Sequence, residues 1–232
     1  MFKRVFLSIF FAFSANLYSA PLLPENTVIA VDLHGVVLNM NFLEVAKTAM
    51  SHCKDYRIFK PLLNPIRFIQ FLKLALKTQT IEKLIEDTGV EYPNILHIKK
   101  MVSDIQNCQN VNKELVQILE KLKSLNYKIY ILSNIGPKTL QDLRHKKPDF
   151  VNLFDDHFIP CQENNYLSKP DSAYYITFKD KFNLHDKRII FLDDRHKNVK
   201  AALQENFDAI LFQNNDQILS ELNKLLPSII KQ

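Results

Sequence analysis

Short apolar runs rich in β-branched residues recur along the chain, and helical patterns separate the later ones. The apolar runs are TVIAVD (27–32), KIYILS (128–133), DHFIP (156–160), RIIFLD (188–193) and AILF (209–212). The helical patterns cover 112–124, 138–145, 172–182, 197–205 and 216–225. Continuous apolar runs are typical of strands buried on both faces, as in a parallel sheet. Strands that alternate with helices predict an open α/β fold.

The stretch 41–110 follows a different pattern. Its apolar residues have helical spacing, it shows no clear strand pattern, and Pro61, Pro65, Gly89 and Pro93 interrupt it. An insert of this kind directly after the first strand predicts a helical cap over the sheet. The catalytic core is then formed by 21–40 together with 111–232.

The first twenty residues form a separate unit. Lys3 and Arg4 precede the apolar run VFLSIFFAF, and the small residues Ser19 and Ala20 follow it. This order is typical of a secretory signal peptide, and the run is short for a membrane span. We therefore expect 1–20 to be a signal peptide, and the mature protein to be exported, periplasmic or secreted, with no stable membrane span. The alternatives are an uncleaved membrane anchor and an apolar N-terminal strand.

Composition and charge indicate an ordinary globular protein. Hydrophobic residues make up 47% of the chain and charged residues 24%, and the formal net charge is +5. Loss of Lys3 and Arg4 would lower it to +3 (5 − 2), a mild excess that indicates no nucleic-acid partner. The three cysteines lack metal-type spacing. In an exported protein Cys53 and Cys108 are able to pair, whereas buried free thiols fit the sequence equally well.

Chemically distinctive residues follow the first predicted strand. In IAVDLHGVV, Asp32 closes the strand, and His34 and Gly35 come directly after it. The carboxyl ends of parallel strands are where α/β folds bind ligands. Gly35 permits a sharp turn that aims backbone N–H groups at an anion.

Two further motifs supply donors and a positive charge. IYILSNIG places Ser133 and Asn134 at the end of the second strand, where a hydroxyl and an amide suit phosphate oxygens, although a capping turn is an alternative. YLSKPDSAYY contains Lys169, which is able to neutralise charge that develops during a reaction. Lys147 stands in the same Lys-Pro-Asp tripeptide, but it precedes the third strand, and we place it in a surface loop.

Adjacent carboxylates end the fourth strand. IIFLDDRHKNV puts Asp193 and Asp194 at the tip of a buried segment, where two carboxylates are costly unless a cation meets them. With Asp32 nearby they predict an oxygen-rich site suited to Mg²⁺. A helix cap would explain one of the two aspartates but not both.

Taken together, the four motifs resemble those of the haloacid dehalogenase superfamily, in order, spacing and strand context, over residues 27–212. The resemblance implies a Rossmann-like parallel sheet of order 3-2-1-4-5, with the insert as a helical cap of the first type. It also implies roles for individual residues. Asp32 is then the nucleophile, and Ser133 and Asn134 bind the transferring group. Lys169 holds the nucleophile and the phosphoryl oxygens. The Mg²⁺ ligands are Asp32, the backbone carbonyl of His34, Asp194, and Asp193 directly or through water.

His34 departs from the pattern of the family's phosphatases, which have a second aspartate at this position. An imidazole with an unperturbed pKa of about 6.5 is able to give and take a proton, so we interpret His34 as a general acid/base. The alternative is a histidine that only fills the turn. The superfamily's dehalogenases have an aromatic residue there and use no metal. Its phosphonate-cleaving members have alanine there and use a cap lysine, for which Lys73 and Lys77 are candidates.

The resulting hypothesis is a Mg²⁺-dependent phosphatase that acts on a small phosphorylated metabolite through an aspartyl-phosphate at Asp32. Two alternatives stay open. One is hydrolysis of a carbon–halogen or carbon–phosphorus bond. The other is a catalytically silent binding domain of the same fold, which the retained Asp32, Lys169, Asp193 and Asp194 disfavour because unused buried charges cost stability.

Overall fold

The computed structural model describes residues 23–41, 43–44, 47–48, 51, 104 and 108–226. The expected signal peptide (1–20) and nearly all of the expected cap (41–110) lie outside these residues. Cys53 does so as well, so its pairing with Cys108 stays a prediction. Within the described part of the chain, no helix is both long enough and apolar enough to cross a membrane.

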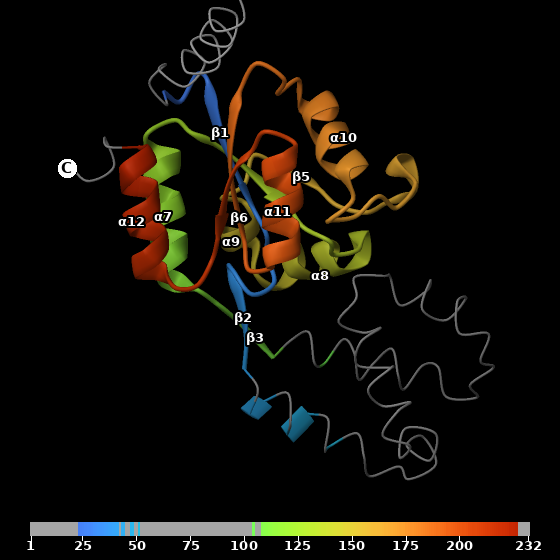
Figure 1. Ribbon diagram of the computed structural model, residues 1–232. Coiled ribbons are helices and arrows are strands. Elements are labelled where there is room, and N and C mark those ends of the chain that lie inside the picture. Colours follow the sequence, from blue (N-terminus) through green and yellow to red (C-terminus); the bar gives the residue numbers. More distant parts are fainter. Residues whose placement is uncertain are drawn as a thin grey trace, which may run out of the picture.

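A parallel sheet forms the centre of the molecule (Figure 1). Its strands are β1 (Thr27–Val31), β4 (Lys128–Leu132), β5 (Asp156–Phe158), β6 (Arg188–Asp193) and β7 (Asp208–Leu211). Their spatial order is β5-β4-β1-β6-β7, and every neighbouring pair is parallel. This confirms the predicted order 3-2-1-4-5. All residues of β1 are buried, as expected for a central strand covered on both faces.

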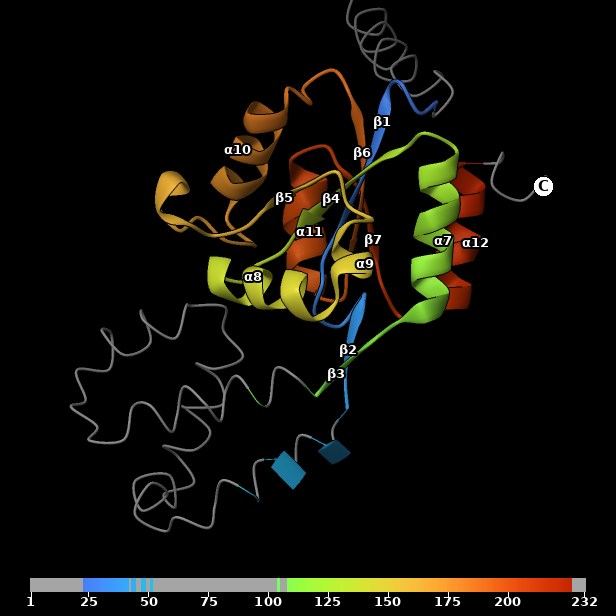
Figure 2. The same cartoon turned by 180° about the vertical axis from the view of Figure 1, so that it is seen from behind.

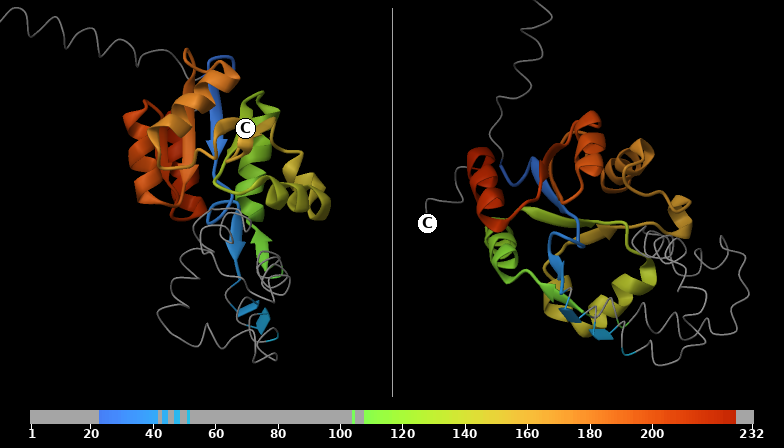
Figure 3. Two further views of the ribbon diagram at one scale, coloured as in Figure 1. Left: turned by 90° about the vertical axis from the view of Figure 1, so that its right-hand side faces the viewer. Right: turned by 60° about the horizontal axis from the view of Figure 1, so that its bottom comes forward.

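Helices cover both faces of the sheet, and Figures 2 and 3 show the layers from other sides. On one face lie α7 (Lys113–Ser124), α8 (Pro137–Lys146), α9 (Pro148–Val151) and α12 (Asn215–Leu225). On the other face lie α10 (Ser172–Phe182) and α11 (His196–Gln204). The helix starts follow from local sequence: the side chains of Asn112, Asp171 and Asn214 cap α7, α10 and α12 by accepting a backbone N–H.

A short antiparallel ribbon connects the core with the insert. It pairs β2 (Leu38–Met40) with β3 (Gln109–Val111), and it lies beyond the carboxyl end of β1 (Figure 1). The expectation that 41–110 contains no strand is wrong at 109–110, where β3 begins. Strands this short, of mixed polarity, carry no periodic signal. The ribbon brings residues from both ends of the insert next to the ends of the central strands.

Candidate active site

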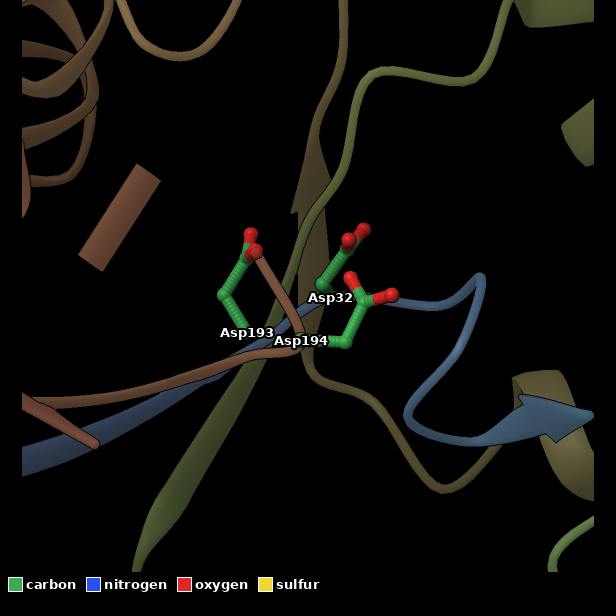
Figure 4. A group of neighbouring side chains, drawn as sticks. All are labelled: Asp32, Asp193 and Asp194. Carbon is green, nitrogen blue, oxygen red and sulfur yellow. The ribbon is translucent and has the colours of Figure 1, made fainter. Parts of the chain in front are cut away.

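Three carboxylates meet where β1 and β6 end (Figure 4). Val31 of β1 pairs with Leu192 of β6, so Asp32 and Asp193 follow at the same level of the sheet. One carboxylate oxygen from each of Asp32, Asp193 and Asp194 lies within 4.8 Å of the others. The sequence prediction that these three residues converge at one sheet edge is thus realised in the structure.

Asp32 is held firmly through one of its oxygens. Oδ1 accepts a hydrogen bond from the backbone N–H of Leu33 at 2.8 Å and lies 3.1 Å from Nζ of Lys169. The side chain is nearly buried, and Oδ2 makes no hydrogen bond within the described part of the chain. A carboxylate fixed at one oxygen and open at the other is suited to attack or to bind a cation.

Lys169 is a buried ammonium surrounded by oxygens. Its Nζ donates to Oδ2 of Asp193 at 2.7 Å and to the carbonyl of Leu132 at 2.7 Å, in addition to its contact with Asp32. Only 3% of the residue is exposed. A buried charge of this kind is tolerated because its hydrogens are satisfied by charged and polar partners. Lys169 therefore links the carboxylates of β1 and β6.

Asp193 is fully buried and heavily hydrogen-bonded. Besides Lys169, its carboxylate accepts the backbone N–H of Arg195 at 2.8 Å and Nδ2 of Asn198, which lies 3.0 Å from both oxygens. Burial raises the pKa of Asp193, and the positive charge of Lys169 opposes that shift. This arrangement makes Asp193 above all an anchor for Lys169. Its metal role, direct or through water, stays a prediction.

Asn134 and Ser133 reach the site from the end of β4. The side chain of Asn134 makes two reciprocal bonds to the backbone of Lys169, donating to its carbonyl at 2.9 Å and accepting its N–H at 2.7 Å. The carbonyl of Ser133 accepts from the hydroxyl of Tyr174 at 2.9 Å. Both residues are buried. The geometry thus gives Asn134 a positioning role toward Lys169, and substrate binding by Ser133 and Asn134 stays a prediction.

Asp194 is the exposed member of the group, and the positive charges of Arg195 and Lys169 offset its negative surroundings only in part. Burial, followed by the negative charges of Asp32 and Asp193, raises its pKa to about 6. An excess of negative charge at an accessible carboxylate group is relieved by a bound cation, and hard oxygen ligands suit Mg²⁺. The residues present therefore fit a magnesium ion held by Asp32 and Asp194.

His34 lies in the loop after β1, where its ring contacts the ribbon. Nδ1 lies 2.7 Å from Nε2 of Gln109. Burial lowers the pKa of His34, the carboxylate of Asp32 opposes this, and Lys169 and Arg195 lower it further. The lowered pKa favours the neutral form of the ring, and Nδ1 already has a hydrogen-bonding partner. General acid/base action by His34 stays a prediction.

The sequence pattern did not indicate some neighbours of the site. Asn198 and Gln109 were not singled out, because a polar residue in a helix or a short strand is unremarkable until its distant partner is known. Lys147 lies between α8 and α9, in a loop as expected. It is half-buried there, and its Nζ donates to the carbonyl of Gln109 at 2.7 Å, a contact that the sequence does not predict. The preference for Lys169 over Lys147 as the lysine next to Asp32 is confirmed.

Comparison with known proteins gives one family. A sequence model described as haloacid dehalogenase-like hydrolase matches residues 27–205. Bifunctional epoxide hydrolase 2 of Sus scrofa is 22% identical over 179 residues, which is 74% of this chain and 31% of that protein. The same enzyme of Mus musculus is 24% identical over 164 residues, or 69% and 29% of the two chains. The chain thus spans less than a third of the length of these curated relatives.

Solved structures share the fold at low sequence identity. A HAD phosphatase from Thermococcus onnurineus superposes with a TM-score of 0.60 at 15% identity, covering 86% of this chain and 97% of that one. A HAD family enzyme from Bacteroides thetaiotaomicron, an aspartate-to-alanine mutant in complex with magnesium and inorganic phosphate, gives 0.56 at 14%, covering 81% and 94%. L-2-haloacid dehalogenase from Xanthobacter autotrophicus, with chloropropionic acid covalently bound, gives 0.56 at 16%, covering 88% and 86%.

Proposed function

This chain belongs to the haloacid dehalogenase-like hydrolases, and from that premise we propose that it is a magnesium-dependent phosphatase acting on small phosphorylated molecules. The covalent intermediate would form on Asp32. The match of the family model to residues 27–205 covers every residue of the candidate site. Membership of the family is shown by this match, whereas the phosphatase reaction is our proposal.

One observation carries the proposal: buried Lys169 lies between Asp32 and Asp193, and exposed Asp194 lies beside them. A carboxylate that attacks a phosphate group meets strong charge repulsion. Preorganised positive charge lowers that barrier, and Lys169 supplies it from a fixed, buried position. The remaining negative charge at Asp32 and Asp194 favours a divalent cation over a site without metal.

The metal site would use residues that the structure already brings together. Asp32 and Asp194 would hold Mg²⁺ together with the backbone carbonyl of His34, and Asp193 would support the site directly or through water. When bound, the ion supplies positive charge that neutralises phosphoryl oxygens. The HAD family enzyme from Bacteroides thetaiotaomicron, in complex with magnesium and inorganic phosphate, supports this choice by likeness of fold.

The chain's own residues would carry two displacements at phosphorus. A carboxylate oxygen of Asp32 attacks in line, the ester P–O bond breaks, and the leaving oxygen takes the bonding electrons and a proton from water. Water then attacks the phosphorus of the aspartyl-phosphate, and the bond between phosphorus and the Asp32 oxygen breaks. The proton of the attacking water passes to solvent, and inorganic phosphate leaves. Asp32 returns to its starting state, and Lys169 remains paired with it throughout.

A dehalogenase is the second candidate, and His34 in place of a second aspartate is the observation that favours it. With an imidazole instead of a carboxyl group at that position, the site suits a leaving group that needs no proton, such as halide. The three clustered carboxylates argue against it, because they favour a bound cation, which the superfamily's dehalogenases do not use.

Activity of the full chain on p-nitrophenyl phosphate and on a panel of phosphorylated metabolites, with Mg²⁺ or with EDTA, tests the proposal. We expect hydrolysis only with Mg²⁺, its loss in Asp32→Asn, and normal rates in the matched control Asp186→Asn. Asp186 is an exposed aspartate just before β6, at the opposite end of that strand from Asp193. Metal-independent release of chloride from 2-chloropropionate would contradict the phosphatase and favour the dehalogenase. Binding of Mg²⁺ without turnover of any ester would indicate a silent binding domain.

Export is a separate proposal that rests on the sequence of residues 1–20. The mass of the mature protein isolated from its native host tests it. A mass that lacks about twenty N-terminal residues is expected for a cleaved signal peptide. The full-length mass would contradict cleavage.

A further inference from the structure

The contact between His34 and Gln109 joins the loop after β1 to the far end of the insert, 75 positions along the chain. Nε2 of Gln109 lies 2.7 Å from Nδ1 of His34, and Gln109 is only 5% exposed. An amide nitrogen donates hydrogen bonds and does not accept them. Nδ1 is therefore the acceptor, and a neutral ring carries its hydrogen on Nε2.

Both partners of this bond are anchored through their backbones. Gln109 pairs with Met40 in the ribbon, and its carbonyl accepts from Nζ of Lys147 at 2.7 Å. On the other side, His34 forms a bridge with Leu38, and the N–H of Gly35 donates to the Leu38 carbonyl at 2.9 Å. The orientation of the imidazole is thus determined by β2, β3 and the start of α9 rather than by the loop after β1 alone.

We propose that Gln109 is a positioning residue, which holds His34 in the tautomer with hydrogen on Nε2. In this tautomer Nε2 of His34 is a hydrogen-bond donor available to an anion bound beside the ring, while the basic nitrogen, Nδ1, is turned to the ribbon and occupied. His34 then stabilises negative charge on oxygen and does not take a proton from water. This role rests on the proposed phosphatase reaction only for its effect on turnover, because the tautomer itself is a property of the resting protein.

Substitutions at position 109 separate the tautomer from mere packing. Gln109→Glu keeps the size of the side chain but offers only acceptors, so a hydrogen must move to Nδ1. Gln109→Leu removes the bond and leaves both tautomers accessible. Loss of one such hydrogen bond corresponds to about a tenfold fall in kcat, with a smaller change in KM. The matched control is Asn110→Leu, the exposed neighbour on the same strand.

The test is ¹⁵N NMR of the full chain labelled at histidine, recorded slightly above neutral pH, with the His34 signals assigned by their loss in His34→Asn. We expect an Nε2–H pattern in the wild type and in Asn110→Leu, a hydrogen on Nδ1 in Gln109→Glu, and averaged shifts in Gln109→Leu. An Nδ1–H or doubly protonated His34 in the wild type would overturn the inference. So would a wild-type pattern that persists in Gln109→Leu.

The same samples separate this inference from the proposed function. If the tautomer behaves as expected but no phosphate ester is hydrolysed, the phosphatase reaction fails and the positioning role stands. If esters are hydrolysed but the NMR pattern of His34 is the same in all variants at position 109, the positioning role of Gln109 fails and the phosphatase reaction stands. Should Gln109→Leu fail to fold, Gln109→Glu, which is nearly isosteric, still decides the question.

Discussion

A Cβ atom built on Gly35 would lie 2.3 Å from Oδ2 of Asp194. Gly35 also has a φ of 82°, in the left-handed region that favours glycine. The loop after β1 and the carboxylate after β6 are therefore in direct contact, and only a residue without a side chain permits this approach.

Gly35→Ala tests how much the site depends on that contact. The substitution forces Asp194 to move and strains the backbone, so we expect a loss of about 1–3 kcal/mol in the free energy of unfolding. Mg²⁺ affinity, measured by titration calorimetry, should fall at least tenfold. Gly136→Ala is the stability control, because Gly136 has a φ of −80° that alanine adopts readily. Unchanged Mg²⁺ affinity in Gly35→Ala would contradict the contact.

Asp194 gives the metal-free protein a defined pH dependence. Its folded-state pKa of about 6 lies above its ordinary value of 3.8, so its protonated form is favoured by folding. The stability that this provides is present below the ordinary value and is lost as pH rises through about 6. In EDTA, the melting temperature of Asp194→Asn should therefore rise relative to that of the wild type as the pH increases from 3.8 to about 6. Excess Mg²⁺ should stabilise the wild type and not the variant. A difference in melting temperature that stays constant over this pH interval would show that folding does not raise the pKa of Asp194.

Lys169→Met should be among the most damaging substitutions. It leaves Asp32 and Asp193 buried beside each other without a cation, and breaking a buried pair in this way costs about 3–5 kcal/mol. Adding Asp193→Asn removes one of the two charges, so the double variant should recover part of the stability but no activity. Denaturant unfolding of the two single variants and the double variant measures the coupling. Strict additivity would mean that Lys169 and Asp193 do not interact.

Asn198→Ala should weaken catalysis through Asp193 and Lys169. Asn198 donates to both oxygens of Asp193 from a buried position, and loss of a hydrogen bond to a charged group costs about 1.5–3 kcal/mol. We expect a reduced kcat with a nearly unchanged KM, and a lower melting temperature. The control is Lys197→Ala, the exposed preceding residue of α11. A kcat equal to that of the wild type would remove Asn198 from the site.

Most of the sheet could be predicted because apolar runs and helix caps are local signals. The helix at 172–182 was predicted with its observed bounds, and the strands differ by a few residues at most. The ribbon escaped prediction because its pairing depends on contacts between the two ends of the insert.

The candidate site was predicted in its residues but not in its hydrogen bonds. Strand ends indicated Asp32, Asp193 and Asp194, and the segment between the third strand and the helix at 172–182 indicated Lys169. The sequence could not tell that Asn134 would bind the backbone of Lys169, or that Gly136, unlike Gly35, adopts an ordinary extended conformation. Such features depend on which residues come into contact after folding, and contacts between residues far apart in the sequence have no local sequence signal.

The central claim, that Asp32 is the nucleophile, is tested most directly by trapping the intermediate. The full chain is mixed with p-nitrophenyl phosphate and Mg²⁺, quenched in acid, digested and analysed by mass spectrometry. The account predicts a phosphoryl group on the peptide that contains Asp32, and none in Asp32→Asn. A phosphoryl group on another residue, or continued turnover by Asp32→Asn, would contradict it.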